Sequence, residues 1–583
     1  MPSSSSSRKA DSLVEEILIA VRRGSVTVNS IRDSFSEGSF SMDASEQGKS
    51  ASIIMDHMIS SAQYGPSIRN VFVGILRSLS KSAPSEGQSF GESYIAELPD
   101  ERALRTLVQL HGKGGNFARP LELLKLMPRS PWRKDQEKRF SNAANLLNNG
   151  LKLNTVKSHQ IIPEGKNVIY HASQSMPHTS SGYAIRTHGL TSSLNSKGYD
   201  VDVYLRNGYP LDRSDFKGND VNAEEKVENV TYHFSHTEPD DSSLINYQEV
   251  YNFNRLDEYE SQAINALISN GRKSKPIAIH SASNFVVGFA GARAAKALGI
   301  PSIYEIRGFW HLTQSTKREG YEGSDHYKLS ERFEIETAKE SDYVFTITKA
   351  LKDILVENGV EESKISVLPN SVDASKFKII PKDVELEKEL GFENKVVIGY
   401  IGSFVDYEGL DLLLEACSIL KEKHGDIFRL LLVGDGDTMQ LLRRTARFLQ
   451  LEDQVVFTGR IPHDEVQKYY SLIDIAPLPR KGLRVCELVS PLKPFEAMGS
   501  GKVLVVSSVQ ALAEIVDDGV TGMVFEKDNS ADLAAKLETA ILDENLRKQI
   551  GKDANKWVME NHSWEVISKR VTKIYDEILE GIQ

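Results

Sequence analysis

Residues 480–502 read RKGLRVCELVSPLKPFEAMGSGK and follow an apolar run, IDIAPLP, that predicts a buried strand. We expect a helix to begin near Pro491, with Lys493 in its first turn. Backbone amides at a helix start, together with a lysine, favour an anion. Arg480 and Lys481 bring further positive charge from the preceding loop, as a diphosphate would require.

Glu496 follows Lys493 by three residues, so the two side chains project from one face of the predicted helix. A carboxylate in that place is suited to accept hydrogen bonds from the paired hydroxyls of a ribose. A helix cap with a surface Lys–Glu pair explains the same spacing equally well. The spacing alone leaves both interpretations open.

The surrounding second half of the chain alternates short apolar runs with amphipathic helices. The predicted strands are Val396–Ile401, Leu430–Val433, Val455–Phe457, Ile473–Ala476 and Val503–Val506. Predicted helices at Leu410–Lys423 and Thr438–Leu449 separate some of them. This alternation is typical of a parallel sheet covered by helices.

An earlier alternation of the same kind begins at Lys166. Its predicted strands are Val168–Tyr170, Val201–Tyr204, Ile277–His280, Ser302–Tyr304, Val344–Ile347 and Ile365–Leu368. A polar excursion, Leu211–Glu260, interrupts it and contains one predicted strand, Val230–Phe234. The charged stretch PKDVELEKELGFENK, residues 381–395, suits a linker. Two doubly wound halves joined by a hinge would place a ligand cleft at the carboxyl ends of both sheets.

Residues 1–160 carry helical periodicity and almost no strand signal. Leucines on either side of HGKGGN, residues 111–116, predict a helical hairpin, without a convincing fixed-period repeat. Three serine-containing stretches are expected to be mobile: Ser3–Ser7, Ser34–Ser45 and Ser80–Ser89.

The predicted organisation has four parts. Residues 1–160 form an α-helical extension that is partly disordered, and 161–380 form an acceptor-side Rossmann-like domain. Residues 381–562 form a donor-binding Rossmann-like domain. Residues 563–583 form a helix, seen from Trp564 to Leu579, that packs back toward the acceptor-side domain.

The composition of the 583 residues is that of a globular protein, with 40% hydrophobic and 26% charged residues. The net charge of −11 argues against a nucleic-acid partner. Cys417 and Cys486 are the two cysteines, which excludes a disulfide scaffold and a four-cysteine zinc site. No run resembles a signal peptide or an integral membrane segment. We expect a cytoplasmic protein and leave open an association with the inner face of a membrane.

SPLKPFEAMGSG, residues 490–501, closely resembles the donor-binding segment of family 4 retaining glycosyltransferases, also called glycosyl transferases group 1. These enzymes have the two-domain GT-B fold. GYIGSFVDYEGLDLLLEA, LLLVGDGDTMQLL and VVFTGRIPHDEVQKYYSLIDIAPLP resemble other parts of their donor domain, in the same order. AIHSASNFVVGFAGARAAKALGIPSIYEIRGFW, DYVFTITKALKDIL and ISVLPNSVD resemble their acceptor-side domain. The resemblance runs from about Lys166 to the end.

The resemblance implies roles for individual residues of the donor domain. Glu496 would bind the donor ribose, and Arg460 with Ile461 would frame the base. The diphosphate and the neighbouring sugar would be held by Ser490, Pro491, Leu492 and Lys493. Gly434 and Gly436, in VGDGD, are more simply explained as permitting a tight turn beside the donor.

In the donor domain, the chain departs from the family pattern at Ser403, Glu408 and Leu488. Many relatives have an arginine and a lysine facing the diphosphate where this chain has Ser403 and Glu408. The nearest candidates to supply the missing charge are Arg480, Lys481 and Lys493. Relatives also have a glutamate at the position of Leu488. Glu487 lies one residue earlier, and its contact with the donor sugar is left open.

On the acceptor side, HASQSMPHTSSGYAIRTHGL, residues 171–190, joins a predicted strand to a predicted helix through Ser180, Ser181 and Gly182. Small residues there let the backbone approach a ligand, and the family uses this loop beside the donor diphosphate. The loop is flanked by His171, His178 and Arg186, each of which alone is more simply a satisfied loop residue.

Two further acceptor-side features stand out. HSASN, residues 280–284, ends a predicted strand with polar groups suited to hydroxyls. Arg307 falls where many relatives carry a histidine near the reacting centre. An arginine cannot act as a base at neutral pH, so Arg307 would stabilise charge or fix the acceptor.

No short cluster of ligands suggests a catalytic metal. Asp435 and Asp437 have a DxD spacing that the family does not use for metal, and a P-loop, a zinc motif and a nucleophile elbow are missing. The expectation is a metal-independent hexosyl-type transferase without a cofactor, whose co-substrate is a nucleotide-sugar and whose acceptor is a glycan or other hydroxyl compound. Polysaccharide or glycan assembly is its expected setting.

Two alternatives remain open. One is a GT-B nucleotide-sugar epimerase. The other is a scaffold with an inactive transferase half, in which the N-terminal helices bind a protein partner. Lys493 and Glu496 argue against the scaffold, whereas Ser403, Glu408 and Leu488 favour it.

Overall fold

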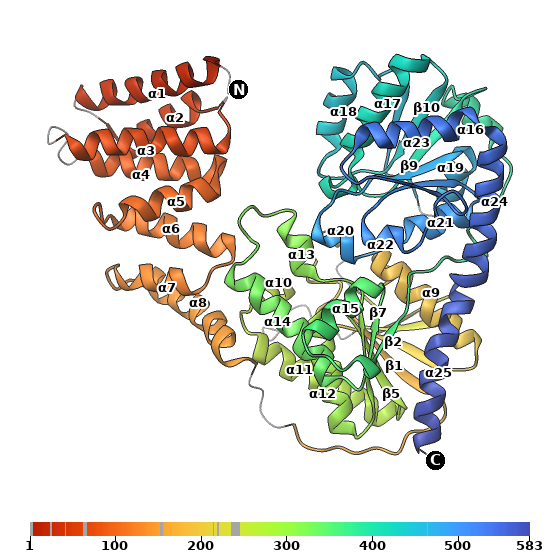
Figure 1. Cartoon of the computed structure of the whole chain (residues 1–583). Coiled ribbons are helices and arrows are strands. Elements are labelled where there is room, and N and C mark those ends of the chain that lie inside the picture. Colours follow the sequence, from red (N-terminus) through yellow and green to blue (C-terminus); the bar gives the residue numbers. More distant parts are fainter. Residues whose placement is uncertain are drawn as a thin grey trace. The chain divides into compact units, whose positions relative to one another are not determined.

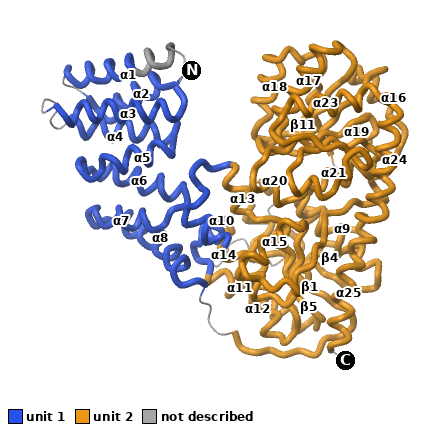
Figure 2. Tube along the Cα trace, viewed as in Figure 1, with its two compact units in different colours: residues 1–152, 248–256, 317–331 blue, residues 153–247, 257–316, 332–583 orange. Residues whose placement is uncertain are grey.

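The computed structural model describes residues 4–23, 26–40, 42–61, 67–151, 156–213, 215–217, 221–234, 245–462 and 465–582. The chain divides into two compact units (Figure 2). The helical unit contains residues 1–152, 248–256 and 317–331. The two-sheet unit contains residues 153–247, 257–316 and 332–583.

The helical unit is built from consecutive helices, as the periodicity predicts (Figure 1). They are α1 (Ser4–Arg22), α2 (Val28–Gly38), α3 (Ala44–Ser60), α4 (Ser67–Ser82), α5 (Pro84–Tyr94), α6 (Glu101–Gly114), α7 (Ala118–Lys125) and α8 (Pro131–Asn149). The predicted hairpin is α6 and α7. Gly115 ends α6 with a φ of 91°, a conformation that favours glycine.

The expectation of mobile serine stretches is wrong for Ser34–Ser45 and Ser80–Ser89, whose described residues lie largely in helices α2 to α5. Phe35 within the first of these stretches and Phe90 directly after the second are buried, and their burial stabilises the helices. Asp43 caps α3 by accepting a hydrogen bond from the Glu46 amide. The first stretch is helical from Ser4, and Ser3 lies outside the described residues.

The helical unit also takes in two later segments that the sequence boundaries assign to residues 161–380. The amides of Phe117 and Ala118 donate hydrogen bonds to Asp325 at 2.6 and 3.0 Å. The His326 ring packs against Phe117 and Phe253. These contacts explain why residues 248–256 and 317–331 belong to this unit.

The first sheet of the two-sheet unit has the order β3-β4-β2-β1-β5-β6-β7-β8, and its pairs are parallel except for β3 with β4. The strands are β1 (Asn167–Ala172), β2 (Asp200–Leu205), β3 (Glu224–Val227), β4 (Val230–His233), β5 (Ala278–Ala282), β6 (Ser302–Ile306), β7 (Tyr343–Thr346) and β8 (Ile365–Val367). Sequence reasoning missed β3, because its residues EEKV are polar and lie at the sheet edge.

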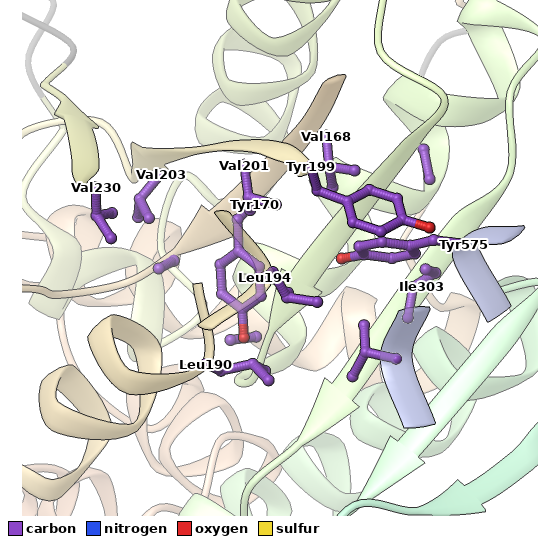
Figure 3. Packing of buried hydrophobic residues seen from close by; sticks show 14 of the residues in the cluster. Val168, Tyr170, Leu190, Leu194, Tyr199, Val201, Val203, Val230, Ile303 and Tyr575 are labelled. Carbon is purple, nitrogen blue, oxygen red and sulfur yellow. The ribbon is translucent and has the colours of Figure 1, made fainter. Parts of the chain in front are cut away.

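Helices accompany these strands along the chain. They are α9 (Gly182–Ser196), α10 (Tyr247–Tyr251), α11 (Leu256–Ser274), α12 (Phe285–Leu298), α13 (Trp310–Ser315), α14 (Asp325–Glu340) and α15 (Lys349–Glu357), with a 3-10 turn η1 (Glu362–Lys364). The last helix of the chain, α25 (Trp564–Ile582), packs into the core of this sheet. Figure 3 shows Tyr575 of α25 beside Tyr199, with ring centres 5.2 Å apart.

The second sheet has the order β11-β10-β9-β12-β13-β14, and its strands are parallel. They are β9 (Val396–Ile401), β10 (Phe428–Val433), β11 (Val455–Gly459), β12 (Ile475–Leu478), β13 (Val503–Ser507) and β14 (Met523–Phe525). The order reverses between β9 and β12, which is the point where doubly wound sheets bind ligands at the carboxyl ends of their strands. Gly402 and Pro479 follow those two strands directly.

Helices surround this second sheet too (Figure 1). They are α16 (Val384–Glu389), α17 (Leu410–His424), α18 (Met439–Phe448), α19 (Val466–Leu472), α20 (Arg484–Leu488), α21 (Lys493–Gly499), α22 (Gln510–Ala513), α23 (Ser530–Leu542) and α24 (Glu544–Asn561), with a 3-10 turn η2 (Asp406–Glu408). The prediction that residues 381–395 form a linker is wrong, since this segment contains helix α16 and the buried Phe392. Among the described helices, none combines the length and apolar character needed to cross a bilayer.

Candidate functional site

A cavity of about 520 Å³ lies in the two-sheet unit, between segments of both sheets. Its lining residues are Met176, Ser180, Ile185, His188, Gly189, Ser371, Val372, Asp373, Lys376, Phe377, Val466, Gln467, Glu496 and Trp564. Of the residues predicted to bind ligand, Ser180 and Glu496 belong to this lining. The cavity therefore joins the start of α9 to α21, as the resemblance implies.

Glu496 is half-buried in the wall of the cavity, one turn into α21. The Tyr470 hydroxyl donates a hydrogen bond to its carboxylate at 3.4 Å. Because the surrounding side chains exclude water, the pKa of Glu496 is raised to about 7. When it is ionised, this carboxylate is able to accept hydrogen bonds from the paired hydroxyls of a ligand.

Lys493 begins α21, two residues after the predicted start, and its ammonium group is held by a buried carboxylate. Lys493 Nζ donates to Glu408 Oε1 at 3.0 Å, and Arg480 Nη2 donates to the same oxygen at 2.8 Å. Lys493 crosses directly over Gly402, where a Cβ would overlap its side chain. Its ammonium lies 5.1 Å from the ring centre of Tyr400.

Glu408 is therefore the centre of a buried ion cluster, which sequence reasoning treated only as a lost positive charge. Burial alone would raise the pKa of Glu408, but Arg480 and Lys493 outweigh it and lower the pKa to about 2. The cluster keeps a net positive charge, because two cations share one carboxylate. The sequence marks Glu408 as a departure from the family pattern, but it does not show which cations the glutamate pairs with.

Lys481 and Glu487, two further charged residues of the 480–502 stretch, have partners away from the cavity lining. Lys481 pairs with Asp406 and Asp411 at 2.8 and 2.9 Å. Glu487 accepts from Lys527 Nζ at 2.5 Å and from the Gln510 amide at 2.7 Å. The structure thus does not bring Lys481 or Glu487 together with Glu496.

The residues expected around the base lie at the loops after β9, β10 and β11. Arg460 has 82% of its side chain exposed, and its Nε lies 3.7 Å from Asp435 Oδ2. Ile461 is half-buried, and Ser403 is exposed, following Gly402. A Cβ at Gly434 would overlap the carbonyl oxygen of Gly402, so this glycine permits the close approach of two loops.

On the acceptor side, Ser181 caps α9 by accepting from the Ala184 amide at 3.4 Å. Gly182 begins the helix, and a Cβ there would stand 3.5 Å from Leu492 Cδ1. The start of α9 and the segment before α21 are therefore in contact range. Pro491 and Ser490 precede Leu492 in that segment, and Ser490 is buried.

Arg307 and Arg186 are buried around Glu305, a residue that sequence reasoning did not single out. Arg186 Nε and Arg307 Nε donate to Glu305 Oε1 at 2.6 and 2.8 Å. Arg307 also donates to the Tyr170 hydroxyl at 2.6 Å and to Thr187 Oγ1 at 2.7 Å. These bonds place the Arg307 guanidinium within the core. A glutamate inside an apolar strand, EIRGFW, was the signal for its buried partners.

The burial of HSASN, residues 280–284, contradicts the prediction that this segment offers polar groups to hydroxyls. HSASN is enclosed in the protein, with His280 and Asn284 both 0% exposed, so these groups do not offer a surface for hydroxyls. The His280 ring contacts the Tyr575 hydroxyl at 2.9 Å. His171 is buried too, and burial lowers its pKa to about 4. His178 packs against Phe216 and Phe234.

Comparison with known protein families decides the family of the chain. Residues 382–575 match the family described as glycosyl transferases group 1, and residues 181–371 match the glycosyl transferase 4-like domain. Together these matches cover more than half of the sequence. The chain belongs to the group 1 glycosyltransferases. The resemblance predicted from residues 490–501 is confirmed.

Individual relatives of this group 1 glycosyltransferase are distant. It is 25% identical to an uncharacterized glycosyltransferase of Methanocaldococcus jannaschii over 41% of this chain and 60% of that protein. It is 24% identical to the capsular polysaccharide biosynthesis glycosyltransferase CapM of Staphylococcus aureus, over 53% of this chain and 78% of that protein. The chain thus spans less than two thirds of the first of these relatives.

Solved structures show the fold of the group 1 glycosyltransferase. Sucrose-phosphate synthase from Thermosynechococcus elongatus matches with a TM-score of 0.58 and 18% identity, over 71% of this chain and 100% of that chain. HepE from Anabaena, in complex with UDP, matches with a TM-score of 0.52 and 16% identity, over 70% of this chain and 100% of that chain. The predicted GT-B fold, preceded by a helical region, is confirmed.

Proposed function

We propose that this group 1 glycosyltransferase moves a sugar from a nucleotide-sugar to a hydroxyl acceptor with retention of configuration, in polysaccharide or glycan assembly. The observation that carries the proposal is the place of Glu496. It lies in the wall of the cavity between the two sheets, three residues after a lysine that reaches the switch point of the donor sheet. The HepE structure of the same fold holds UDP, which supports a nucleoside diphosphate as the leaving group.

In this proposal, the Glu496 carboxylate accepts hydrogen bonds from the two ribose hydroxyls. The ammonium of Lys493 faces the diphosphate and stabilises the negative charge that develops as the sugar bond breaks. Glu408 and Arg480 hold that ammonium in place. By analogy with the family, the departing phosphate oxygen takes the acceptor proton on the same face of the sugar.

We also propose that the reaction needs no divalent metal, because side-chain cations can neutralise the diphosphate. Among the described residues, no group of three or more His, Cys, Asp or Glu side chains is arranged to hold a metal ion. The cationic cluster around Glu408 lies beside the proposed phosphate position and is the expected substitute for a metal.

A panel of nucleotide-sugars, scored for release of nucleoside diphosphate with and without a chelator, tests this function. We expect one class of nucleotide-sugar to release its nucleoside diphosphate, at the same rate with and without chelator. The anomeric carbon of the transferred sugar should have the same configuration in the product as in the donor. Loss of turnover in chelator that magnesium or manganese restores would contradict metal independence. Inversion at C2 of the donor without transfer would indicate the epimerase instead.

The pH dependence of nucleoside binding tests the role of Glu496 separately. Its pKa of about 7 means that the unliganded site is largely protonated below neutral pH, whereas the ribose binds the carboxylate. Affinity for a bare nucleoside should therefore rise with pH and level off above pH 7. Well below that pKa, lowering the pH by one unit should reduce the affinity for the nucleoside by up to about tenfold.

Calorimetry with the bare nucleoside measures this dependence without any titrating phosphate. The Glu496→Gln variant is the matched control, and its weaker binding should not vary with pH. Wild-type binding that is equally independent of pH would show that Glu496 does not receive the ribose.

A further inference from the structure

Three consecutive backbone carbonyls, those of residues 488–490, each accept a hydrogen bond from a different side chain. Thr348 Oγ1 donates to the Leu488 oxygen at 2.6 Å. Arg480 Nη1 donates to the Val489 oxygen at 2.8 Å, and Asn370 Nδ2 donates to the Ser490 oxygen at 2.8 Å. We call residues 488–490 the clasped loop.

The side chains that hold the clasped loop come from both sheets. Thr348 follows β7 and caps α15, and Asn370 follows β8, so both belong to the eight-stranded sheet. Arg480 follows β12 of the six-stranded sheet. Thr348 and Asn370 are 3% and 5% exposed, so water does not compete for these bonds. Side chains that follow strands of both sheets therefore hold the loop by hydrogen bonds.

Asn370 and Arg480, which hold the clasped loop, also bond to buried charged clusters. Asn370 Oδ1 accepts from Arg186 Nη1 at 3.1 Å, so its amide is oriented and its Nδ2 points to the loop. On the other side, Arg480 shares the carboxylate of Glu408 with Lys493. Polar contacts thus run from the core of the acceptor-side domain, through the clasped loop, to the lysine at the start of α21.

The clasped loop leads directly into the residues that the proposed function uses. Two residues separate Ser490 from Lys493, and five separate it from Glu496. A shift of the loop would therefore move both groups relative to the acceptor-side domain. Misplacement by about 1 Å is enough to cost an enzyme about a hundredfold in rate.

We propose that Thr348 and Asn370 are positioning residues, which hold the clasped loop and through it set Lys493 and Glu496 against the acceptor-side domain. They act without touching the donor. The same geometry gives Arg480 the task of holding the loop and Lys493, in place of the direct diphosphate contact that the sequence predicts. This inference rests on the proposed function of the cavity.

Two substitutions each remove one hydrogen bond to the clasped loop with little change in the volume of the side chain. Thr348→Val loses the hydroxyl that reaches Leu488, and Asn370→Asp loses the donor to Ser490 while it keeps an acceptor for Arg186. Thr337→Val and Asn195→Asp are matched controls, since their side chains bond within the acceptor-side domain alone. Thr348→Ser keeps a hydroxyl and should restore the wild-type behaviour.

Hydrogen exchange and steady-state kinetics on the full chain measure the effect. We expect faster deuterium uptake in residues 484–499 of Thr348→Val and Asn370→Asp. Their kcat should fall about tenfold to a hundredfold, with nucleoside diphosphate affinity within about threefold of wild type because the contacts to it remain. The thermal midpoint of Asn370→Asp should match that of Asn195→Asp, whereas Thr348→Val also loses the cap of α15 and should unfold at a lower temperature. This split between turnover and binding is not expected of a residue that only stabilises the fold.

Several results would overturn the inference. Uptake in residues 484–499 equal to that of the controls would show that these side chains do not hold the loop. Faster uptake with an unchanged kcat would show that the loop does not position the reacting groups. If wild type releases no diphosphate from any nucleotide-sugar, the proposed function fails, and with it the catalytic purpose of the clasp, while the exchange result still decides whether the grip exists.

Discussion

Replacing Glu305 by glutamine is expected to lower the free energy of unfolding by about 3–5 kcal/mol, the cost typical of removing one partner from a buried ion pair. Glu305 is 0% exposed, and Arg186 and Arg307 share its Oε1 oxygen. Their charges hold the pKa of Glu305 well below its usual range against the opposing effect of burial. A neutral amide would leave two buried guanidinium groups close together without a counter-charge.

Urea unfolding followed by circular dichroism measures this loss, and hydrogen exchange in β1 and β6 assigns it to the eight-stranded sheet. Glu362→Gln is the matched control, because Glu362 pairs with Lys352 at the surface and is 67% exposed. Its effect should stay below about 1 kcal/mol. An equally small effect of Glu305→Gln would mean that the two arginines do not depend on this carboxylate.

The sign of the pH dependence follows from the lowered pKa. The stability that Glu305 contributes is fully present above the ordinary carboxyl pKa and is lost only as pH falls through the lowered value. Wild type should therefore lose stability in acid relative to Glu305→Gln, and the difference between the two should narrow as the pH is lowered.

The elements of the fold were largely predictable, because strands such as Val396–Ile401 combine apolar β-branched residues with turn signals on either side. Strand β3 was missed because its residues are mostly charged, and strand β14 was missed because it is only three residues long. The mobile serine stretches were predicted wrongly because composition outweighed the helical spacing of residues such as Phe35.

The charged partners within the site could not be predicted from the sequence. Glu408 and Arg480 are 72 positions apart, and Arg186 and Glu305 are 119 apart. Local pattern says which residue types are present but not which of them the fold brings together. Glu408 is one of the departures that favour the scaffold alternative, yet it pairs with Arg480 and Lys493 and leaves Lys493 at the start of α21.

Lys493→Ala is expected to weaken nucleoside diphosphate binding by about tenfold to more than a hundredfold. A charge-assisted hydrogen bond contributes about 1.5–3 kcal/mol, which corresponds to that range. The fold should survive the change, since Glu408 keeps its ion pair with Arg480 at 2.8 Å. Lys481→Ala is the matched control, because Lys481 pairs with Asp406 and Asp411 and should leave affinity unchanged.

The central claim is that the diphosphate lies at Lys493 and the ribose at Glu496. Calorimetry of Lys493→Ala and Glu496→Gln, each with a bare nucleoside and with its diphosphate, tests it most directly. The account predicts that Lys493→Ala weakens the diphosphate and barely changes the nucleoside, whereas Glu496→Gln weakens both ligands. Equal weakening of nucleoside and diphosphate by Lys493→Ala would contradict the placement of the leaving group.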